Sequence, residues 1–490
     1  MREFVSALQM QNIDQRTMNL NRLDSFGLMQ KVTDSMLEFF QAELDLSGDI
    51  LFLCGPGNNG ADGYLLAEKL RKTRAQFRES LQKPDRKVWV YEVLKPKSID
   101  CIKAAKFCKA ERVSDLNLIL KKAGSNFMIV DAVFGYQARA DLPAAVAKIL
   151  KEVNAAKAFR VALDMPSGIE AEGGKCHRDS FLADVSLCVG FPKLSFLNEE
   201  VAEFLGRVEF IGDFFLSPRD AAKKKFFAIE RKDFIFSKRA RVSHKSQFGK
   251  CGIVGGSAQT PGAAFLSAEA AHRVGAGYVN LFLARAQKFE LSLKTSSFLF
   301  KKNWAAKDLN SMSSLVLGCG GFPEKFDFKN IKVPSVLDAD ALQDLKQIQK
   351  ISSDVLLTPH PGEAARLLKS TNQKILKDRV GALDELVKKS LQSVYLKGAP
   401  GILKLSPKIS SGDIYYVNLS INPVFAKAGS GDILSGIAGG FLAQKPMQFK
   451  DAILSGLIFQ QNLGEVLRDQ RATIASDQLH SFSKTFERLK

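Results

Sequence analysis

The residue types that point most directly to chemistry form a glycine-rich segment near the C-terminus. Gly429 and Gly431 flank Ser430, and Asp432 follows at the start of a helical pattern. Glycines leave the N–H groups of a helix start open to an anion, which the helix dipole also favours. A carboxylate in that turn could accept a proton from a hydroxyl nucleophile while the amides hold a phosphoryl group. The same pattern also fits an Asp that caps a helix after a glycine turn.

A second glycine-rich segment, CGPGNNGADGY, occupies residues 54–64. It follows an apolar run and opens a helical pattern. Asn58, Asn59 and Asp62 bring polar groups to a helix start that suits a phosphate. The spacing matches neither G-x-G-x-x-G nor G-x-x-x-x-G-K-[ST], so neither standard nucleotide fingerprint applies. A plain Gly/Asn turn with an acid near the helix start explains the segment equally well.

Two carboxylates end apolar runs that are predicted to be strands. Asp131 precedes Ala-Val-Phe-Gly, and Asp164 precedes Met-Pro-Ser-Gly. In an open α/β sheet the ligand crevice lies outside the carboxyl ends of the strands. These carboxylates, the Asn58 and Asn59 amides and the Ser167 hydroxyl could therefore converge on a cation, which prefers hard oxygen ligands. Strand-end Asp residues also cap their own turns, so this alternative stays open.

One histidine falls at a predicted strand-to-helix junction. His360 lies between Pro359 and Pro361, and Glu363 follows. Proline and glutamate are favoured at helix starts, so His360 could face a ligand there. The alternative is a surface histidine between two prolines.

Two α/β patterns must position these residues. In the first half, strands are predicted at residues 50–54, 87–94, 127–131 and 159–164, and helices at 4–44, 62–81, 98–109 and 142–151. In the second half, strands are predicted at 251–255, 278–283, 314–318, 336–339, 354–358, 394–398 and 414–418, and helices at 262–274, 374–391, 430–443 and 451–467. This alternation indicates parallel sheets that helices cover on both faces.

The length of 490 residues exceeds one ordinary domain. We expect a first domain at residues 1–216 and a second at 226–490. At residues 217–241 we expect a basic linker and the entry to the second domain, because this segment contains nine basic and three acidic residues.

Composition excludes several classes of protein. With 46% hydrophobic and 25% charged residues, the chain is neither disordered nor fibrous. It has no apolar run of about 18 residues, so no membrane span is expected. The seven cysteines are odd in number and lack C-x-x-C spacing, which argues against a disulfide framework or a zinc site. The N-terminus does not read as a signal peptide, so a cytoplasmic location is expected. The net charge of +18 is dispersed, so no nucleic-acid partner is expected.

The N-terminal motifs together resemble the epimerase domain of the NAD(P)HX repair enzymes. The family's N-N-G-G-D-G loop, its Asp-led strand end before F-G and its D-x-P-S-G turn stand here at residues 58–63, 131–135 and 164–168. The resemblance implies a Rossmann-like αβα sandwich that interconverts the R and S hydrates of NADH and NADPH. It implies that Asn59, Asp131 and Ser167 hold K⁺. The substrate contacts it implies are Asn58, Asn59, Gly60, Ala61, Asp62, Gly135 and Asp164.

Two departures from this family pattern bear on the epimerase. Ala61 replaces a family glycine, and the family's M-E-x-A-G reads MQKVT at residues 29–33. The polar residues at the strand ends remain, so we expect a working epimerase in which Asp164 takes and returns a proton. A non-catalytic binding or scaffold domain is the alternative.

The second half resembles the ribokinase-like superfamily, and more narrowly its ADP-dependent NAD(P)HX dehydratases. The motifs, in order, are H-K-x-x-F-G, G-G-S, P-G-A-A, A-G-Y-V, L-D-A-D-A-L, T-P-H-P-G-E, K-G-A and G-S-G-D, over residues 226–490. The resemblance implies a catalytic Asp432 that removes the proton of the substrate hydroxyl, ADP as co-substrate, and Mg²⁺. It implies that Ala263, His360 and Asp432 contact the hydrate. The nucleotide contacts it implies are Lys397, Gly398, Ala399, Pro400, Gly401, Gly429, Ser430 and Gly431.

The expected partners are NADHX or NADPHX, ADP and further copies of the chain in a homo-oligomer. The alternative function is a small-molecule kinase of the hydroxymethylpyrimidine or hydroxyethylthiazole type, fused to a non-catalytic N-terminal domain. The T-P-H-P-G-E motif and the fused first domain argue against it.

Overall fold

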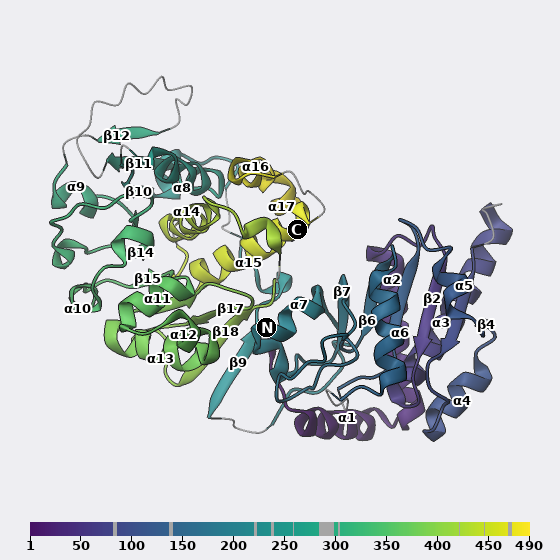
Figure 1. Cartoon of the computed structure of the whole chain (residues 1–490). Helices are drawn as coiled ribbons and strands as arrows, with labels where there is room; N and C mark the ends of the chain where they lie inside the picture. Colours follow the sequence, from purple (N-terminus) through teal and green to yellow (C-terminus); the bar gives the residue numbers. More distant parts are fainter. Residues whose placement is uncertain are drawn as a thin grey trace. The chain divides into compact units, whose positions relative to one another are not determined.

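The chain forms two compact units, Arg2–Ala222 and a second unit that comprises Met1 and Lys223–Lys490 (Figure 1). The computed structural model describes residues 1–81, 86–136, 141–219, 223–236, 240–257, 259–283, 298–301, 304–420, 422–444, 446–468 and 473–490. Within these residues, no helix is both long and apolar enough to cross a membrane.

The N-terminal unit is built on a parallel sheet with the order β4-β3-β2-β5-β6-β7-β8. Its strands are β2 (Ile50–Cys54), β3 (Val88–Glu92), β4 (Glu111–Val113), β5 (Met128–Ala132), β6 (Phe159–Leu163), β7 (Val185–Val189) and β8 (Arg207–Ile211). Its helices are α1 (Ala7–Asn21), α2 (Ser25–Glu43), α3 (Asn58–Leu81), α4 (Ile99–Phe107), α5 (Leu116–Leu120), α6 (Ala144–Ala155) and α7 (Glu199–Leu205).

Both faces of this sheet are apolar, as strands covered on two sides require. In β2, Ile50 and Phe52 pack in a cluster with residues of α2, α3 and α4. Leu51 and Leu53 point the other way and pack with residues of α5 and α6. This alternation fixes the register of the strands, so their carboxyl ends fall at one edge.

The C-terminal unit has a mixed sheet that runs β9-β18-β17-β16-β15-β14-β13-β10-β11-β12. β17 is antiparallel to β16 and β18, and the other pairs are parallel. The strands are β9 (Lys224–Ala228), β10 (Lys250–Gly255), β11 (Tyr278–Leu283), β12 (Leu299–Lys301), β13 (Ser314–Leu317), β14 (Ser335–Leu337), β15 (Val355–Leu357), β16 (Ser393–Leu396), β17 (Gly401–Lys404) and β18 (Asp413–Asn418).

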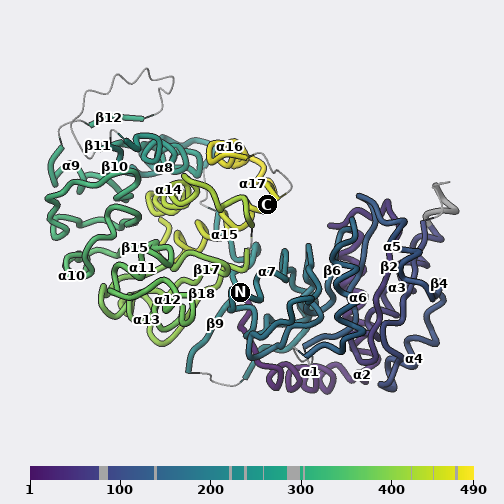
Figure 2. Tube along the Cα trace, in the orientation of Figure 1, coloured from purple at the N-terminus to yellow at the C-terminus, as the bar shows by residue number. Residues whose placement is uncertain are grey.

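One face of this sheet packs on α8 (Pro261–Arg273), α14 (Ser430–Ala443), α15 (Phe449–Leu467), α16 (Ala475–His480) and α17 (Phe482–Leu489). The remaining helices are α9 (Ala306–Asn310), α10 (Leu345–Ile348), α11 (Pro361–Leu368), α12 (Asn372–Lys377) and α13 (Arg379–Ser390), of which α13 packs on β16 and β17. Figure 2 traces the path of the chain through these elements. Glycines make the contact of α14 with α8 close, because a Cβ on Gly436 would lie 2.2 Å from the Ser267 carbonyl oxygen.

The α/β fold class predicted for both halves is confirmed, and most predicted strands are found within two residues of their expected ends. The single helix predicted at residues 374–391 is wrong. Two helices, α12 and α13, replace it because the chain breaks at Asp378, whose side chain caps α13 by accepting from the Gly381 N–H. Within the segment predicted as linker and entry, β9 forms a strand parallel to β18, and Phe226 stacks on Tyr415.

Candidate active sites

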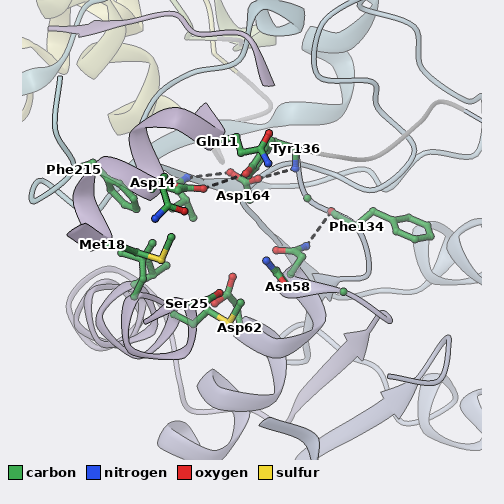
Figure 3. Close-up of a pocket in the computed structure, with 18 of the residues that line it drawn as sticks. Gln11, Asp14, Met18, Ser25, Asn58, Asp62, Phe134, Tyr136, Asp164 and Phe215 are labelled. Atoms are coloured by element: carbon green, nitrogen blue, oxygen red, sulfur yellow. Dashed lines mark hydrogen bonds between the residues drawn. The ribbon is translucent and has the colours of Figure 1, made fainter. Parts of the chain in front are cut away.

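A pocket of about 400 Å³ lies in the N-terminal unit, at the carboxyl ends of β5 and β6 and the start of α3 (Figure 3). Its lining comes from α1, α2, the turn before α3 and the first turns of α3, the loops after β5 and β6, the end of β7 and the loop after β8. The residues are Gln11, Asp14, Gln15, Met18, Ser25, Leu28, Met29, Val32, Pro56, Gly57, Asn58, Asn59, Asp62, Val133, Phe134, Gly135, Tyr136, Asp164, Val189 and Phe215.

The glycine-rich turn before α3 is shaped by close backbone packing. A Cβ on Gly55 would lie 1.9 Å from the Val133 carbonyl oxygen, and one on Gly60 would lie 2.1 Å from the Gly55 carbonyl oxygen. Only glycine fits such approaches. Ala61 lies inside α3 with its side chain fully buried, so its methyl group is accommodated in helical backbone. Gly60 and Ala61 support the pocket wall and do not line it.

A chain of hydrogen bonds joins the three residues for which K⁺ binding is expected. The Ser167 N–H and hydroxyl donate to Asp131, at 2.7 and 2.8 Å. Ser167 Oγ accepts from the Phe134 N–H at 2.9 Å, and Asn59 Nδ2 donates to the Phe134 carbonyl oxygen at 2.9 Å. The other amide oxygen, Asn59 Oδ1, is buried without a hydrogen-bond partner. A buried polar atom without a partner is costly, so Asn59 Oδ1 is available to an ion, a ligand or a water molecule at this point.

Asp164 is held by a buried ion pair. Its Oδ1 accepts from Lys193 Nζ at 2.6 Å, and the Lys193 side chain is 0% exposed. Its Oδ2 accepts from the Tyr136 N–H at 2.8 Å. Burial opposes the charge of Lys193, but Asp164 outweighs it, so the pKa of Lys193 lies above its usual value. Asp164 also has a φ of 65°, which non-glycine residues adopt only where the surroundings hold them.

Two further carboxylates in the pocket, Asp14 and Asp62, hold their protons more tightly than an ordinary Asp does. Asp14 accepts from the Tyr136 hydroxyl at 3.1 Å. Burial raises the pKa of Asp14 to about 6, against the opposing effects of Tyr136 and Lys193. Burial, with the nearby charges of Asp164 and Asp14, raises the pKa of Asp62 well above its usual value. The pocket therefore holds carboxyl groups with different proton affinities, as acid–base chemistry requires.

The second candidate site lies at the N-terminus of α14. Gly429 precedes the helix with a φ of 93°, and Asp432 is in the first turn. A Cβ on Gly431 would lie 3.5 Å from Lys397 Nζ and 3.6 Å from Asp338 Oδ2, so these groups adjoin the helix start. The structure thus brings Asp432, Gly429, Ser430, Gly431 and Lys397 together. A phosphoryl group at this position would meet both helix-start amides and an ammonium group.

Asp338 organises this second site. It accepts from Lys397 Nζ at 2.8 Å and from the Ser435 hydroxyl at 2.7 Å. Burial opposes the charge of Lys397, but Asp338 and Glu363 outweigh it, so the pKa of Lys397 is raised. Burial, reinforced by the charge of Asp338, raises the pKa of Asp432 to about 6. Asp432 is therefore poised to exchange a proton near neutral pH.

The remaining predicted residues of the second half lie on neighbouring loops and helix starts. His360 caps α11, with Nδ1 accepting from the N–H groups of Gly362 and Glu363, and its side chain is 57% exposed. Ala263 lies in the first turn of α8, beside Gly320. The segment that contains Gly398, Ala399, Pro400 and Gly401 links β16 to β17, next to Lys397. No grouping of three metal-ligating His, Cys, Asp or Glu side chains occurs among the described residues.

Sequence reasoning missed Asp14, Tyr136, Lys193 and Asp338 as site residues. Asp14 lies on a helix 122 positions before its partner Tyr136, and Lys193 pairs with a carboxylate 29 positions away. No local pattern connects such residues. Asp338 belongs to a quoted motif, L-D-A-D-A-L, and its place directly after a predicted strand could have marked it in the way that Asp131 and Asp164 were marked.

Both halves of the chain match known protein families. The family model for NAD(P)H-hydrate dehydratase matches residues 251–488, and the model for the YjeF-related protein N-terminus matches residues 25–195. A bifunctional NAD(P)H-hydrate repair enzyme from Coxiella burnetii is 29% identical over 444 residues, with 86% of each chain covered. The corresponding enzyme from Moorella thermoacetica is 28% identical and covers 97% of this chain and 95% of its own.

The Escherichia coli enzyme of the same description is 28% identical, with 93% of this chain and 88% of its own covered. A solved structure described as an ADP/ATP-dependent NAD(P)H-hydrate dehydratase from Bacillus subtilis, co-crystallised with ATP and Mg²⁺, is 24% identical. It covers 52% of this chain and 95% of its own, with a TM-score of 0.45. The full-length relatives contain both halves in the same order, as the two family models do. The chain therefore belongs to the family of bifunctional NAD(P)H-hydrate repair enzymes.

Proposed function

We propose that the chain repairs hydrated NADH and NADPH in two steps. The N-terminal unit interconverts the R and S hydrates, and the C-terminal unit dehydrates the S form with ADP as co-substrate. The observation that supports this best is Asp432 in the first turn of α14, beside the Asp338–Lys397 pair, in a chain whose full-length relatives are described as bifunctional repair enzymes.

In the dehydration, Asp432 takes the proton of the hydroxyl at C6 of the hydrated ring. The hydroxyl oxygen attacks the β-phosphorus of ADP, and AMP leaves. The ring nitrogen then expels phosphate from C6, and loss of a proton from C5 regenerates the dihydropyridine. The N–H groups at the start of α14 and the Lys397 ammonium stabilise charge on the phosphoryl oxygens. The products are NAD(P)H, AMP and phosphate.

Substrate and nucleotide contacts follow from the positions of the residues. Ala263 and His360 would contact the hydrate, and Lys397, Gly398, Ala399, Pro400 and Gly401 would contact ADP together with Gly429, Ser430 and Gly431. Mg²⁺ usually takes one or two carboxylates together with substrate phosphates and water. Asp338, whose Oδ2 adjoins the start of α14, fits such a partial ligand set. Bound there, Mg²⁺ would neutralise phosphate charge.

In the epimerisation, Asp164 would exchange a proton with the substrate, and Asn58, Asn59, Asp62 and Gly135 would line the binding surface. The unpartnered Asn59 Oδ1 is an oxygen of the kind that K⁺ prefers, and it is joined through Phe134 and Ser167 to Asp131. Asn59, Asp131 and Ser167 would therefore hold K⁺, which would supply positive charge beside an anionic substrate.

The test uses the purified chain with mixed R- and S-NADHX and ADP, ATP or no nucleotide. Dihydronicotinamide absorbance reports dehydration, and chromatography reports the two epimers. We expect ADP-dependent loss of both epimers, and R-to-S conversion without nucleotide that K⁺ accelerates. Phosphorylation of a hydroxymethylpyrimidine or hydroxyethylthiazole by ATP, without dehydration, would favour the kinase instead.

We further propose that the protein is located in the cytoplasm and forms a homo-oligomer. Cell fractionation tests the location, and light scattering tests the oligomeric state.

A further inference from the structure

The N-terminal pocket contains a carboxylate that lies outside every motif of the family resemblance. Asp14 is on α1, before the residues 25–195 that the family model matches, yet it lines the same pocket as Asp164. Tyr136 connects the two carboxylates: its N–H donates to Asp164 at 2.8 Å and its hydroxyl donates to Asp14 at 3.1 Å (Figure 3).

The surroundings of the two carboxylates differ in a way that separates their roles. Asp164 accepts from the Lys193 ammonium and from the N–H groups of Tyr136 and Val189, so its carboxylate is paired with an ammonium group and two N–H donors. Asp14 accepts from the neutral Tyr136 hydroxyl and lies near the charges of Asp164 and Asp62. Burial and the charge of Asp164 favour protonation of Asp14, whereas the Tyr136 hydroxyl and Lys193 favour its ionised form.

Inverting C6 of the hydrate needs both a base and an acid. The carbon bears a hydroxyl group and the ring nitrogen N1, so the C6–N1 bond can open. When the hydroxyl proton is removed, the C6–O bond becomes a carbonyl and the C6–N1 electron pair moves to N1, which must take up a proton. After rotation about C5–C6, N1 attacks the other face of the carbonyl, and both protons return. No oxidant or reductant is required.

We propose that Asp14 is the second catalytic residue of the epimerase, which gives a proton to N1 as the ring opens while the Asp164 carboxylate takes the hydroxyl proton. This proposal rests on the epimerase function proposed above. The two carboxyls exchange roles when the ring closes, so each turnover restores the starting state. The pKa of Asp14, raised to about 6, allows the protonated form near physiological pH.

The test measures R-to-S conversion of pure R-NADHX by the full chain without nucleotide, after subtraction of the spontaneous rate. Removing a positioned acid typically costs about 10²–10⁴-fold. We therefore expect Asp14→Asn to lower kcat about 100-fold with little change in KM. For the wild type, kcat should fall as pH rises through about 6, where Asp14 loses its proton, and Asp14→Asn should lack this fall. Glu38→Gln, at an exposed carboxylate on α2 outside the pocket lining, is the matched control.

Tyr136→Phe separates a catalytic role of Asp14 from a structural one. The variant keeps the N–H bond to Asp164 and removes the hydroxyl that lowers the pKa of Asp14, so the fall in kcat should move to higher pH. The proposal would be overturned if Asp14→Asn kept near-wild-type kcat, or if its kcat were reduced but still fell with pH as in the wild type. If Asp14→Asn does not fold, the proposal is overturned when kcat of Tyr136→Phe falls at the same pH as kcat of the wild type. If the wild type and Glu38→Gln both fail to accelerate R-to-S conversion, the epimerase function itself is refuted, and the role of Asp14 with it.

Discussion

Replacing Lys193 by methionine should destabilise the N-terminal unit strongly and in a pH-dependent manner. Lys193 Nζ lies 2.6 Å from Asp164 Oδ1, with side-chain exposures of 0% and 7%. Methionine fills most of the space of the lysine stem but leaves a buried carboxylate without its counter-charge. Removing one partner of a buried ion pair costs about 3–5 kcal/mol. Because backbone N–H donors of Tyr136 and Val189 remain, we expect the lower end, about 3 kcal/mol.

The pH dependence follows from the same unpaired charge. In Lys193→Met, a proton on the buried Asp164 would cancel the unpaired charge of the folded protein, whereas the unfolded chain gains nothing from it. Stability relative to wild type should therefore recover at acid pH, where the folded variant binds one more proton than the unfolded chain, and worsen as pH rises. Lys193→Met combined with Asp164→Asn has no unpaired charge, so the double variant should be less destabilised than the sum of the two single variants.

Unfolding in urea can be followed for this unit alone. The chain has two tryptophans, Trp89 in the N-terminal unit and Trp304 in the other, so a Trp304→Phe background leaves the buried Trp89 as reporter. Lys148→Met, on the exposed side of α6, is the matched control. The reasoning would be refuted if the urea midpoint of Lys193→Met were as close to that of the background as the midpoint of Lys148→Met. It would also be refuted if the loss of stability in Lys193→Met did not become smaller at acid pH.

Three further outcomes are expected. Asp432→Asn should reduce nucleotide-dependent dehydration by about 10²–10⁴-fold with the circular dichroism spectrum unchanged, and near-wild-type turnover would contradict its role. Gly436→Ala should destabilise the C-terminal unit by about 1–3 kcal/mol, because its Cβ would lie 2.2 Å from the Ser267 carbonyl oxygen, whereas Gly262→Ala, with open space around it, should not. Ala61→Gly restores the family residue. Because Ala61 is helical, this change should lower the free energy of unfolding in urea by about 1 kcal/mol and leave the rate of R-to-S conversion unchanged. A faster rate would contradict this expectation.

The fold and the strand-end carboxylates could be predicted from the sequence because their signals are local. A run such as ILFLC is buried on both faces, so it indicates a parallel strand without knowledge of its neighbours. Once strands are assigned, the topology of a parallel sheet brings their carboxyl ends to one edge. Asp131 and Asp164 could therefore be placed near each other and near the turn at Asn58 before any contact was known.

The partners of these carboxylates could not be predicted, because they depend on tertiary packing. Lys193 occurs in a chain with 70 basic residues, and nothing in its local sequence marks it as the one that is buried. Asp14 lies on a helix whose buried residues, Met10, Ile13 and Thr17, predict only which side faces the protein. That its carboxylate meets Tyr136 depends on where α1 docks, which the periodicity of a helix does not specify.

The position of the altered motif, residues 29–33, in the pocket shows what its changes affect. Met29 and Val32 line the pocket, so this part of α2 still forms its wall. Thr33 is fully buried, and its hydroxyl donates to the Met29 carbonyl oxygen and accepts from Lys69 Nζ, which fixes the segment. The glutamate that the family carries in this motif is absent, yet three carboxyl groups still line the pocket, namely those of Asp14, Asp62 and Asp164. The departure thus changes the chemistry of one wall and leaves the proposed acid–base pair, Asp14 and Asp164, in place, which favours an active epimerase over a scaffold.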